Sequence, residues 1–290
     1  MNLLERFRLE LRSAAPRPEI LALTIAGVVD QELEIETIVR QLDELAAVME
    51  RALHDIPSGY EHALRFLDVI RHDLGFKGNS KEYYAPDNSY LHIVLRRRTG
   101  LPIMLSLVCM AIGARLGLDM AGIGFPGHFM TRYRDERGEW LLDPFHGEVI
   151  EVRAASHYLS RLFEQHVTLS AEQFRAVTAP ELVQRILLNL RNAYLGRKEY
   201  IYVLQTLDYL QELTPADASL WQEKGLIHYH LDNWEDASYA LRRYFYLAGQ
   251  LMLVYGQEQN KELAQATLQP HDVQLIEIYQ HIEETRRRLN

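Results

Sequence analysis

The sequence predicts a fold of the α+β class, followed by a domain that is entirely helical. Three observations lead to this prediction. Apolar residues recur at helical spacing up to residue 116, four short apolar or alternating runs follow between residues 120 and 152, and the helical pattern returns from Glu181 onward. We therefore expect a helical N-terminal part with a small antiparallel sheet over residues 1–177, and a helical domain over residues 178–290.

Composition and charge exclude several classes of protein. Hydrophobic residues make up 48% of the 290 residues, which is enough for one large domain or two moderate ones. The net charge of −9 repels phosphate backbones and anionic lipids, so we expect neither nucleic acid nor a membrane as a partner. The single cysteine, Cys109, excludes an internal disulfide framework. Because no signal-peptide pattern and no apolar run of ~18 residues is visible, we expect a cytoplasmic protein.

The N-terminal part predicts several helices in succession. The first lies between about Asp30 and His54, where six apolar residues recur at steps of mostly three and four: Leu33, Ile38, Leu42, Leu45, Met49 and Leu53. Pro57-Ser58-Gly59 ends it, and a second helical pattern runs to Gly75. A loop, a short helix and an arginine run follow. The stretch Ile103–Leu116 is apolar on nearly all sides, which predicts a helix buried in the middle of the domain.

The next segment predicts an antiparallel sheet of four strands. The four runs are Met120–Gly124, His128–Tyr133, Glu139–Asp143 and Val149–Val152. Turn residues separate them, and Pro126-Gly127 stands between the first two. Strands joined by such short turns pair with their neighbours in the chain, so we expect a meander.

The C-terminal helical part carries an internal repeat. Four residues have the spacing of a tetratricopeptide unit: Trp221, Gly225, Ala237 and Leu241. A shift by the ~34 residues of such a repeat aligns Tyr200 with Trp234. Two helix pairs and a terminal helix, Val273–Leu289, would form a small capped solenoid.

This helical part is also rich in tyrosine, and its aromatic residues predict a surface for a protein or peptide partner. Amphipathic aromatic side chains are favoured in such surfaces because the ring is apolar while its polar group forms hydrogen bonds. The candidate partner-binding residues are Tyr194, Tyr200, Trp221, Tyr229 and Trp234.

His128 and Asp143 are the strongest candidates for a site. His128 opens one predicted strand and Asp143 closes the next strand of the same hairpin, so their side chains are expected to meet. Either the carboxylate satisfies the imidazole and pins two strands together, or the pair lines a cleft that binds a polar ligand with His146. Two histidines and an aspartate can also ligate a metal, but no HExxH-like spacing is present and we predict no metal site.

Further residues carry a resemblance to a known family. They are Gly100-Leu101-Pro102, Leu116-Gly117, His128 and Asp143-Pro144, and their order resembles the papain-like core of the transglutaminase-like superfamily. Asn88-Ser89, the segment from Arg98 to Ile103 and Phe125-Pro-Gly-His-Phe129, followed by repeat-like helices, resemble the bacterial SirB-type subgroup. The resemblance implies a degenerate transglutaminase-like core joined to a repeat domain, in a subgroup without established catalytic activity.

The resemblance places Pro102 where the superfamily has its nucleophilic cysteine. Proline has no nucleophile and no backbone N–H, but it suits the first turn of a helix. Cys109 lies seven residues into the predicted helix and is expected to be a buried, inert thiol. Ser106, one turn into the helix, is a weaker candidate for ligand binding or nucleophilic attack, because it would need a geometry different from that of the family.

These observations favour a non-catalytic binding or scaffold protein whose C-terminal repeats hold a protein or peptide. The alternative is a cysteine-independent hydrolase or amide-processing enzyme that uses His128 and Asp143 to activate water. A third hypothesis is a regulatory subunit whose degenerate cleft contacts an active enzyme. No glycine-rich phosphate loop stands between a strand and a helix, so we expect no cofactor.

Overall fold

The computed structural model describes residues 1–255 and 270–289. The chain forms two compact units, Met1–Arg197 and Lys198–Asn290, which are described separately. The first unit combines helices with a small antiparallel sheet and the second is helical, so the predicted fold class is confirmed. The domain boundary at residues 177 and 178 stays a prediction, and the first compact unit continues past it through α8 (Ala179–Gly196).

Six α-helices form the N-terminal part of the first unit. They are α1 (Leu3–Leu11), α2 (Pro18–Thr24), α3 (Ile35–Leu53), α4 (Tyr60–Asp68), α5 (Leu91–Arg97) and α6 (Pro102–Arg115). The predicted amphipathic helix is α3, but it begins at Ile35 and not at Asp30. Asp30 accepts a hydrogen bond from the backbone N–H of Glu32, which forms a local turn in place of the first helical turn.

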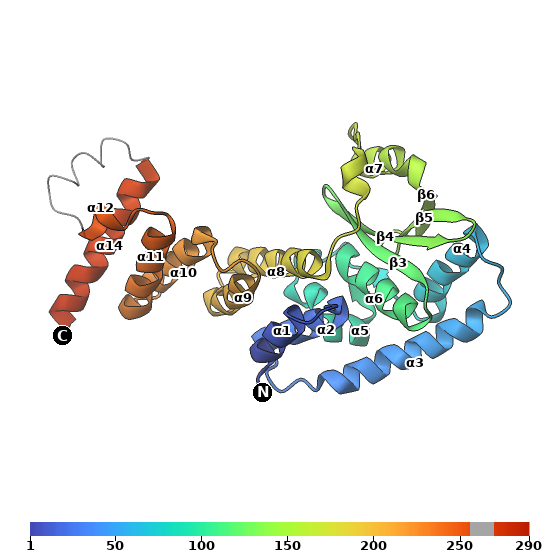
Figure 1. The fold of residues 1–290 in the computed structure, drawn as a ribbon, viewed down its shortest axis with the longest axis horizontal. Coiled ribbons are helices and arrows are strands. Elements are labelled where there is room, and N and C mark those ends of the chain that lie inside the picture. The colour runs from blue at the N-terminus through green and yellow to red at the C-terminus, as the bar shows by residue number, and fades with distance from the viewer. Residues whose placement is uncertain (256–269, 290) are drawn as a thin grey trace. The chain divides into compact units, whose positions relative to one another are not determined.

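Helix α6 is the centre of the first unit. Its residues from Pro102 to Cys109 are all buried, as the apolar run predicted. One side of α6 packs on the sheet, and the other contacts α2, α3 and α5 (Figure 1). Burying a polar side chain in a helix enclosed in this way costs free energy, which explains why its buried residues are apolar except for Ser106.

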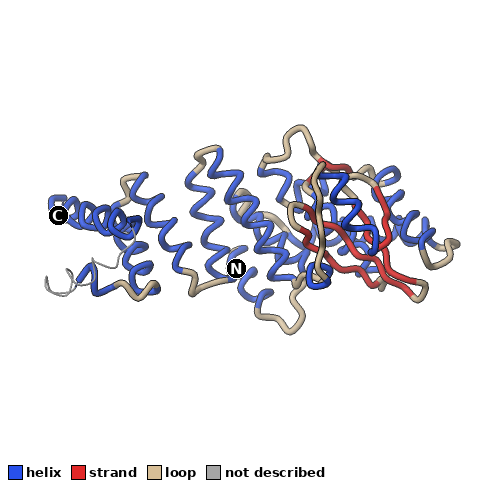
Figure 2. The backbone as a smooth tube through the Cα atoms, turned by 90° about the horizontal axis from the view of Figure 1, so that it is seen from above, coloured by secondary structure: helices blue, strands red, loops and turns tan. Residues whose placement is uncertain are grey.

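The sheet is an antiparallel meander, as predicted. Its strands, in the order of the chain and of the sheet, are β3 (Asp119–Phe125), β4 (His128–Asp135), β5 (Gly138–Asp143) and β6 (Glu148–Glu151). Pro126 and Gly127 turn β3 into β4, and Gly127 has a φ of 73°, which glycine adopts without strain. Helix α7 (Ala155–Phe163) covers the face opposite α6, and it lies across the strands in Figure 2.

Two short pairings lie outside the strands that the sequence predicted. The strands β1 (Lys77–Gly78) and β2 (Thr99–Gly100) form a parallel pair beside the start of α6. Ala176 pairs with Ile123 on β3, and the N–H of Val177 donates to the carbonyl of Gly122 at 2.9 Å. Pairings of one or two residues leave no alternating pattern, so periodicity could not predict them.

The second unit consists of helices throughout its described residues. They are α9 (Tyr200–Leu213), α10 (Ala218–His230), α11 (Trp234–Leu247), α12 (Leu251–Tyr255) and α14 (Pro270–Leu289). Helices α10 and α11 pack closely at Gly225, where a Cβ atom would lie 2.6 Å from the side chain of Leu241. Close packing therefore explains the glycine of the predicted repeat, whose tetratricopeptide identity stays a prediction. Among the described helices of the whole chain, none is long and apolar enough to cross a membrane.

Candidate functional site

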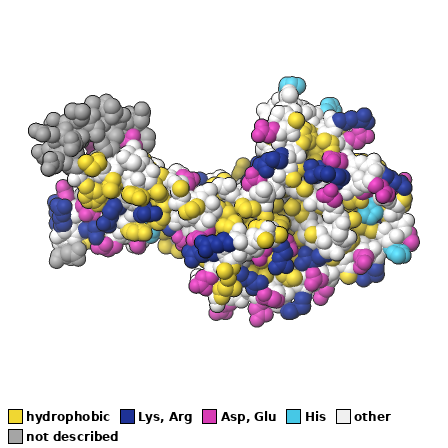
Figure 3. Space-filling model, viewed as in Figure 1, with side chains coloured by type: hydrophobic (Ala, Val, Ile, Leu, Met, Phe, Trp, Pro, Cys, Tyr) yellow, Lys and Arg dark blue, Asp and Glu magenta, His cyan; other side chains and the backbone are white. Residues whose placement is uncertain are grey.

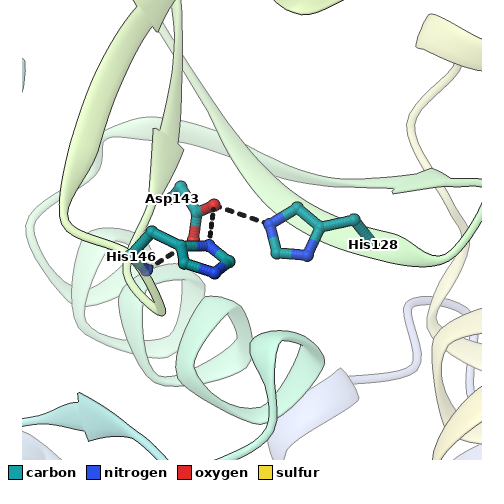
Figure 4. A group of neighbouring side chains, drawn as sticks. All are labelled: His128, Asp143 and His146. Carbon is teal, nitrogen blue, oxygen red and sulfur yellow. Dashed lines mark hydrogen bonds and ion pairs between the residues drawn. The ribbon is translucent and has the colours of Figure 1, made fainter. Parts of the chain in front are cut away.

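His128 and Asp143 are brought together by the register of strands β4 and β5. Thr131 lies opposite Leu142, so Asp143 lies beside Met130, two residues from His128 and on the same face of the sheet. His128 Nε2 lies 2.6 Å from Asp143 Oδ2 (Figure 4). Because a carboxylate only accepts, this nitrogen carries the proton and donates it.

Asp143 is fully buried, and hydrogen bonds satisfy both of its carboxylate oxygens. Oδ2 also accepts from His146 Nδ1 at 2.9 Å and from the hydroxyl of Tyr158 at 2.7 Å. Oδ1 accepts from the backbone N–H groups of Phe145 and His146. Burial by itself would raise the pKa of Asp143, but the hydrogen bonds from His128, His146 and Tyr158 outweigh it and hold this pKa far below its usual range.

The loop after Asp143 is held by Arg71 and a glycine. The Arg71 guanidinium donates to the carbonyl oxygens of Pro144 and Phe145, at 3.0 and 3.2 Å. Gly147 has a φ of 86°, and its N–H donates a hydrogen bond to the carbonyl of Asp143 at 2.7 Å. A Cβ atom at Gly147 would lie 2.4 Å from the Arg71 side chain, so a larger residue would be strained by the positive φ and would displace the guanidinium. This loop positions His146 beside His128, with ring centroids 5.3 Å apart.

A cavity of about 340 Å³ opens beside His128 and the start of α6. We call it the α6–α8 cavity, and its lining consists of Tyr83, Leu101, Pro102, Ile103, Phe125, Gly127, His128, Phe129, Arg185, Leu188 and Asn189. Pro102 is the first residue of α6 and reaches the same cavity as His128. No cysteine, serine or threonine is among these lining residues, so the cavity offers no thiol or aliphatic hydroxyl nucleophile.

The other two candidates on α6 are buried. Cys109 is fully buried, as expected, and burial raises the pKa of its thiol strongly. Ser106 is also fully buried and does not line the cavity, and its Oγ has no hydrogen-bond partner among the described residues. In this structure neither side chain is accessible to a ligand in the cavity.

Among the described residues, His128, Asp143 and His146 form a group that could hold a metal ion. One possible ligand atom from each of His128, Asp143 and His146 lies within 4.8 Å of the others. The sequence predicted no metal because the HExxH spacing is missing, whereas the hairpin and its loop bring these donors together from separate positions. In this arrangement each imidazole donates one N–H to Asp143, which fixes the orientation of both rings.

The five candidate partner-binding residues differ in exposure. Tyr194 is buried on α8, and its hydroxyl lies 2.8 Å from that of Tyr90 in the core of the first unit. Its side chain is therefore inaccessible to a partner, which corrects the expectation that it lines a surface. The other four are partly buried in the second unit, where three of them pack against its core: Trp221, Tyr229 and Trp234.

Several residues near the site were missed by the sequence analysis, among them Arg71, Tyr83 and three residues on helices α7 and α8. Tyr158 lies on α7, and Arg185 and Asn189 lie on α8, one turn apart. Arg185 and Asn189 share a helix face by their spacing of four residues, which was the available signal. Nothing in the sequence places that face beside His128, because the contact depends on how α8 packs on the sheet.

Comparison with known proteins agrees with this geometry. Residues 36–188, more than half of the chain, match the transglutaminase-like superfamily. The UPF0162 protein of Xylella fastidiosa (strain Temecula1 / ATCC 700964) is 31% identical over 180 residues, covering 60% of this chain and 63% of that protein. F-box only protein 21 of Mus musculus is 31% identical over 183 residues, covering 60% of this chain and 28% of that protein. Protein SirB1 of Salmonella typhimurium is 23% identical over 193 residues, covering 66% of this chain and 72% of that protein.

The aligned part of the chain spans less than two thirds of the Xylella protein and less than a third of the mouse protein. The match nevertheless includes every strand of the sheet, the whole of α6 and both members of the His128–Asp143 pair. The predicted resemblance is confirmed: the chain belongs to the transglutaminase-like superfamily, in a SirB-type family together with the UPF0162 and SirB1 proteins.

Proposed function

We propose that this protein is a non-catalytic binding or scaffold protein whose C-terminal helical unit holds a protein or peptide partner. The main support for a non-catalytic role is the presence of Pro102 at the start of α6. This proline occupies the helix start beside an oriented His128, and the cavity there has no thiol or aliphatic hydroxyl in its lining. Acyl transfer through a covalent intermediate requires such a nucleophile next to the histidine.

The surface that supports the second half lies on α11 and α12. A groove of about 340 Å³ is lined by Tyr239, Arg242, Arg243, Tyr246, Leu251 and Tyr255, and we call it the α11–α12 groove. Three of its tyrosines are exposed by more than half: Tyr239, Tyr246 and Tyr255. Figure 3 shows hydrophobic and basic side chains gathered over these helices. Tyrosine and arginine are enriched among the residues that dominate protein interfaces.

The two arginines of the groove indicate the chemistry of the partner. Arg243 lies over the rings of Trp221 and Tyr246, with its guanidinium carbon 5.6 and 5.5 Å from their centroids. Neither Arg242 nor Arg243 lies within ion-pair distance of a carboxylate among the described residues, although the charge of Arg242 helps to lower the pKa of Glu283. In a chain with a net charge of −9, this unpaired basic pair favours an acidic segment that also carries apolar side chains.

Affinity capture with the tagged full-length chain tests the proposal. We expect a stoichiometric partner that is lost on Arg242→Glu combined with Arg243→Glu. The matched control is Arg287→Glu combined with Arg288→Glu on α14, which makes the same change of charge at two exposed residues outside the groove. Equal capture by both double variants would contradict the proposed surface.

The competing enzyme hypothesis draws on the orientation of His128. Its Nε2–H is fixed on Asp143, so its ring is held at the cavity and could activate a water molecule there. Such an enzyme would hydrolyse amide or ester substrates, and both His128→Ala and Asp143→Asn would abolish turnover in a folded protein. We expect the wild-type chain to show no such turnover above a buffer control.

A further inference from the structure

We propose that the α6–α8 cavity binds a carboxylate group attached to an apolar body. This inference is independent of the α11–α12 groove, because it concerns the first unit alone. The lining of the cavity combines polar and apolar side chains. Arg185 and Asn189 on α8 are polar, as are His128 and Tyr83, and the apolar lining consists of Leu101, Pro102, Ile103, Phe125, Phe129 and Leu188.

Arg185 is an exposed side chain whose guanidinium has no carboxylate partner among the described residues. The guanidinium lies against the backbone of Gly124, where an added Cβ atom would be 2.5 Å from its central carbon. Its hydrogen bond to the carbonyl of Gly124 is long, at 3.4 Å. A guanidinium has five N–H donors, so most of its hydrogen-bonding capacity remains for a ligand.

Two carboxylates in the neighbourhood of the cavity, those of Glu181 and Asp143, already have partners of their own. Glu181, one turn before Arg185, is paired with Arg175, whose guanidinium and the capping hydrogen bond from Thr178 lower the pKa of Glu181 to about 2. Asp143 lies behind His128 with both oxygens satisfied. Among the described residues no carboxylate pairs with Arg185, so its charge is available to a negatively charged ligand.

The neighbours of Arg185 suit a carboxylate better than a phosphate. Asn189 offers one neutral amide next to the guanidinium. Together the two side chains supply one positive charge and several N–H donors, which match the single negative charge and two oxygens of a carboxylate. A phosphate would require further cationic groups, and Arg185 is the only Lys or Arg in the lining that the structure describes. Aliphatic and aromatic side chains make up most of the remaining lining, beside His128, so the group that carries the carboxylate is apolar.

N-acetyl-phenylalanine is a suitable probe because it joins one carboxylate to one aromatic ring. N-acetyl-phenylalaninamide is its neutral counterpart and differs only at the carboxyl group. Titration calorimetry or protein NMR on the full chain measures both affinities. Because hydrogen bonds to a charged group contribute about 1.5–3 kcal/mol, we expect the amide to bind at least about tenfold more weakly than the acid.

Three variants test the assignment to Arg185. Arg185→Gln removes the charge and is expected to weaken binding of the acid about tenfold or more, with little effect on the amide. Gly124→Ala keeps the charge but pushes the guanidinium away from the strand, so it is expected to weaken binding of the acid as well. Arg191→Gln on the same helix does not touch the cavity and is expected to leave binding unchanged.

The source of the carboxylate is distinguished by a second pair of probes. A hexapeptide ending in phenylalanine is measured with a free and with an amidated C-terminus. Tighter binding of the free peptide than of N-acetyl-phenylalanine would assign the cavity to chain ends, and the reverse order would assign it to small acids. Equal affinity for acid and amide, unchanged affinity in Arg185→Gln, or no binding of any probe at its solubility limit would overturn the proposal.

Discussion

The hydroxyl of Tyr158 on α7 donates a hydrogen bond to Asp143 Oδ2 over 2.7 Å, which ties the helix to the end of strand β5. Burial and the negative charge of Asp143 raise the pKa of Tyr158, so the hydroxyl remains a donor throughout the physiological range. Tyr158→Phe keeps the ring and removes only this bond. We expect it to lower the free energy of unfolding by about 1.5–3 kcal/mol, the usual contribution of a hydrogen bond to a charged group.

Urea unfolding of the full chain measures this change. Tyr84→Phe is the control, because that side chain is 81% exposed and its hydroxyl faces water. A loss in Tyr158→Phe no larger than in the control would show that the bond contributes nothing to stability.

Asp143 makes stability depend on pH in the acid range. Its pKa is lowered in the folded chain relative to the unfolded value of about 4, so the folded state binds fewer protons between the two values. The stabilisation from this carboxylate is therefore complete above about pH 4 and is lost as the pH falls towards the folded pKa. We expect the difference in unfolding free energy between wild type and Asp143→Asn to shrink below about pH 4. A difference that stays constant from pH 7 to pH 3 would contradict this expectation.

Replacing Pro102 by cysteine tests whether the rest of the acyl-transfer site is preserved. The new thiol would stand at the start of α6 and share the cavity with His128, and both features lower a thiol pKa. We expect iodoacetamide to alkylate Pro102→Cys about tenfold faster at pH 6 than it alkylates free cysteine. Wild type serves as the blank because Cys109 is buried. Adding His128→Ala should remove most of the enhancement, and an unchanged rate would mean that the histidine does not act on this position.

Gly225→Ala tests the close packing in the helical unit. The added methyl carbon would lie 2.6 Å from Leu241, and overpacking of this kind costs about 1–3 kcal/mol. Loss of a helical glycine offsets part of that cost, by about 0.5–1 kcal/mol. We expect faster hydrogen exchange of the α10 and α11 amides. Gly196→Ala is the control, because its Cβ position is surrounded by open space, and its amides should exchange at the wild-type rate. Equal exchange rates in the two variants would contradict the close packing at Gly225.

The buried helix and the sheet could be predicted from sequence because local patterns specify them. The all-apolar run gives α6 within a residue at each end. The turn between Asp135 and Gly138 gives the hairpin of β4 and β5 that brings His128 to Asp143. Tyr158 and Arg185 could not be predicted in this way. Their partners lie 15 and 61 residues away, and only the packing of α7 and α8 on the sheet brings them together.

The pairing of Ala176 and Val177 with β3 has a consequence for association. An open edge strand is a template on which another chain can add a strand. Here the chain covers part of the β3 edge with its own backbone, before α8 begins. The opposite edge, β6, is four residues long and begins and ends with a glutamate. The sheet is thereby protected against edge-to-edge aggregation on one side by its own backbone and on the other by shortness and charge.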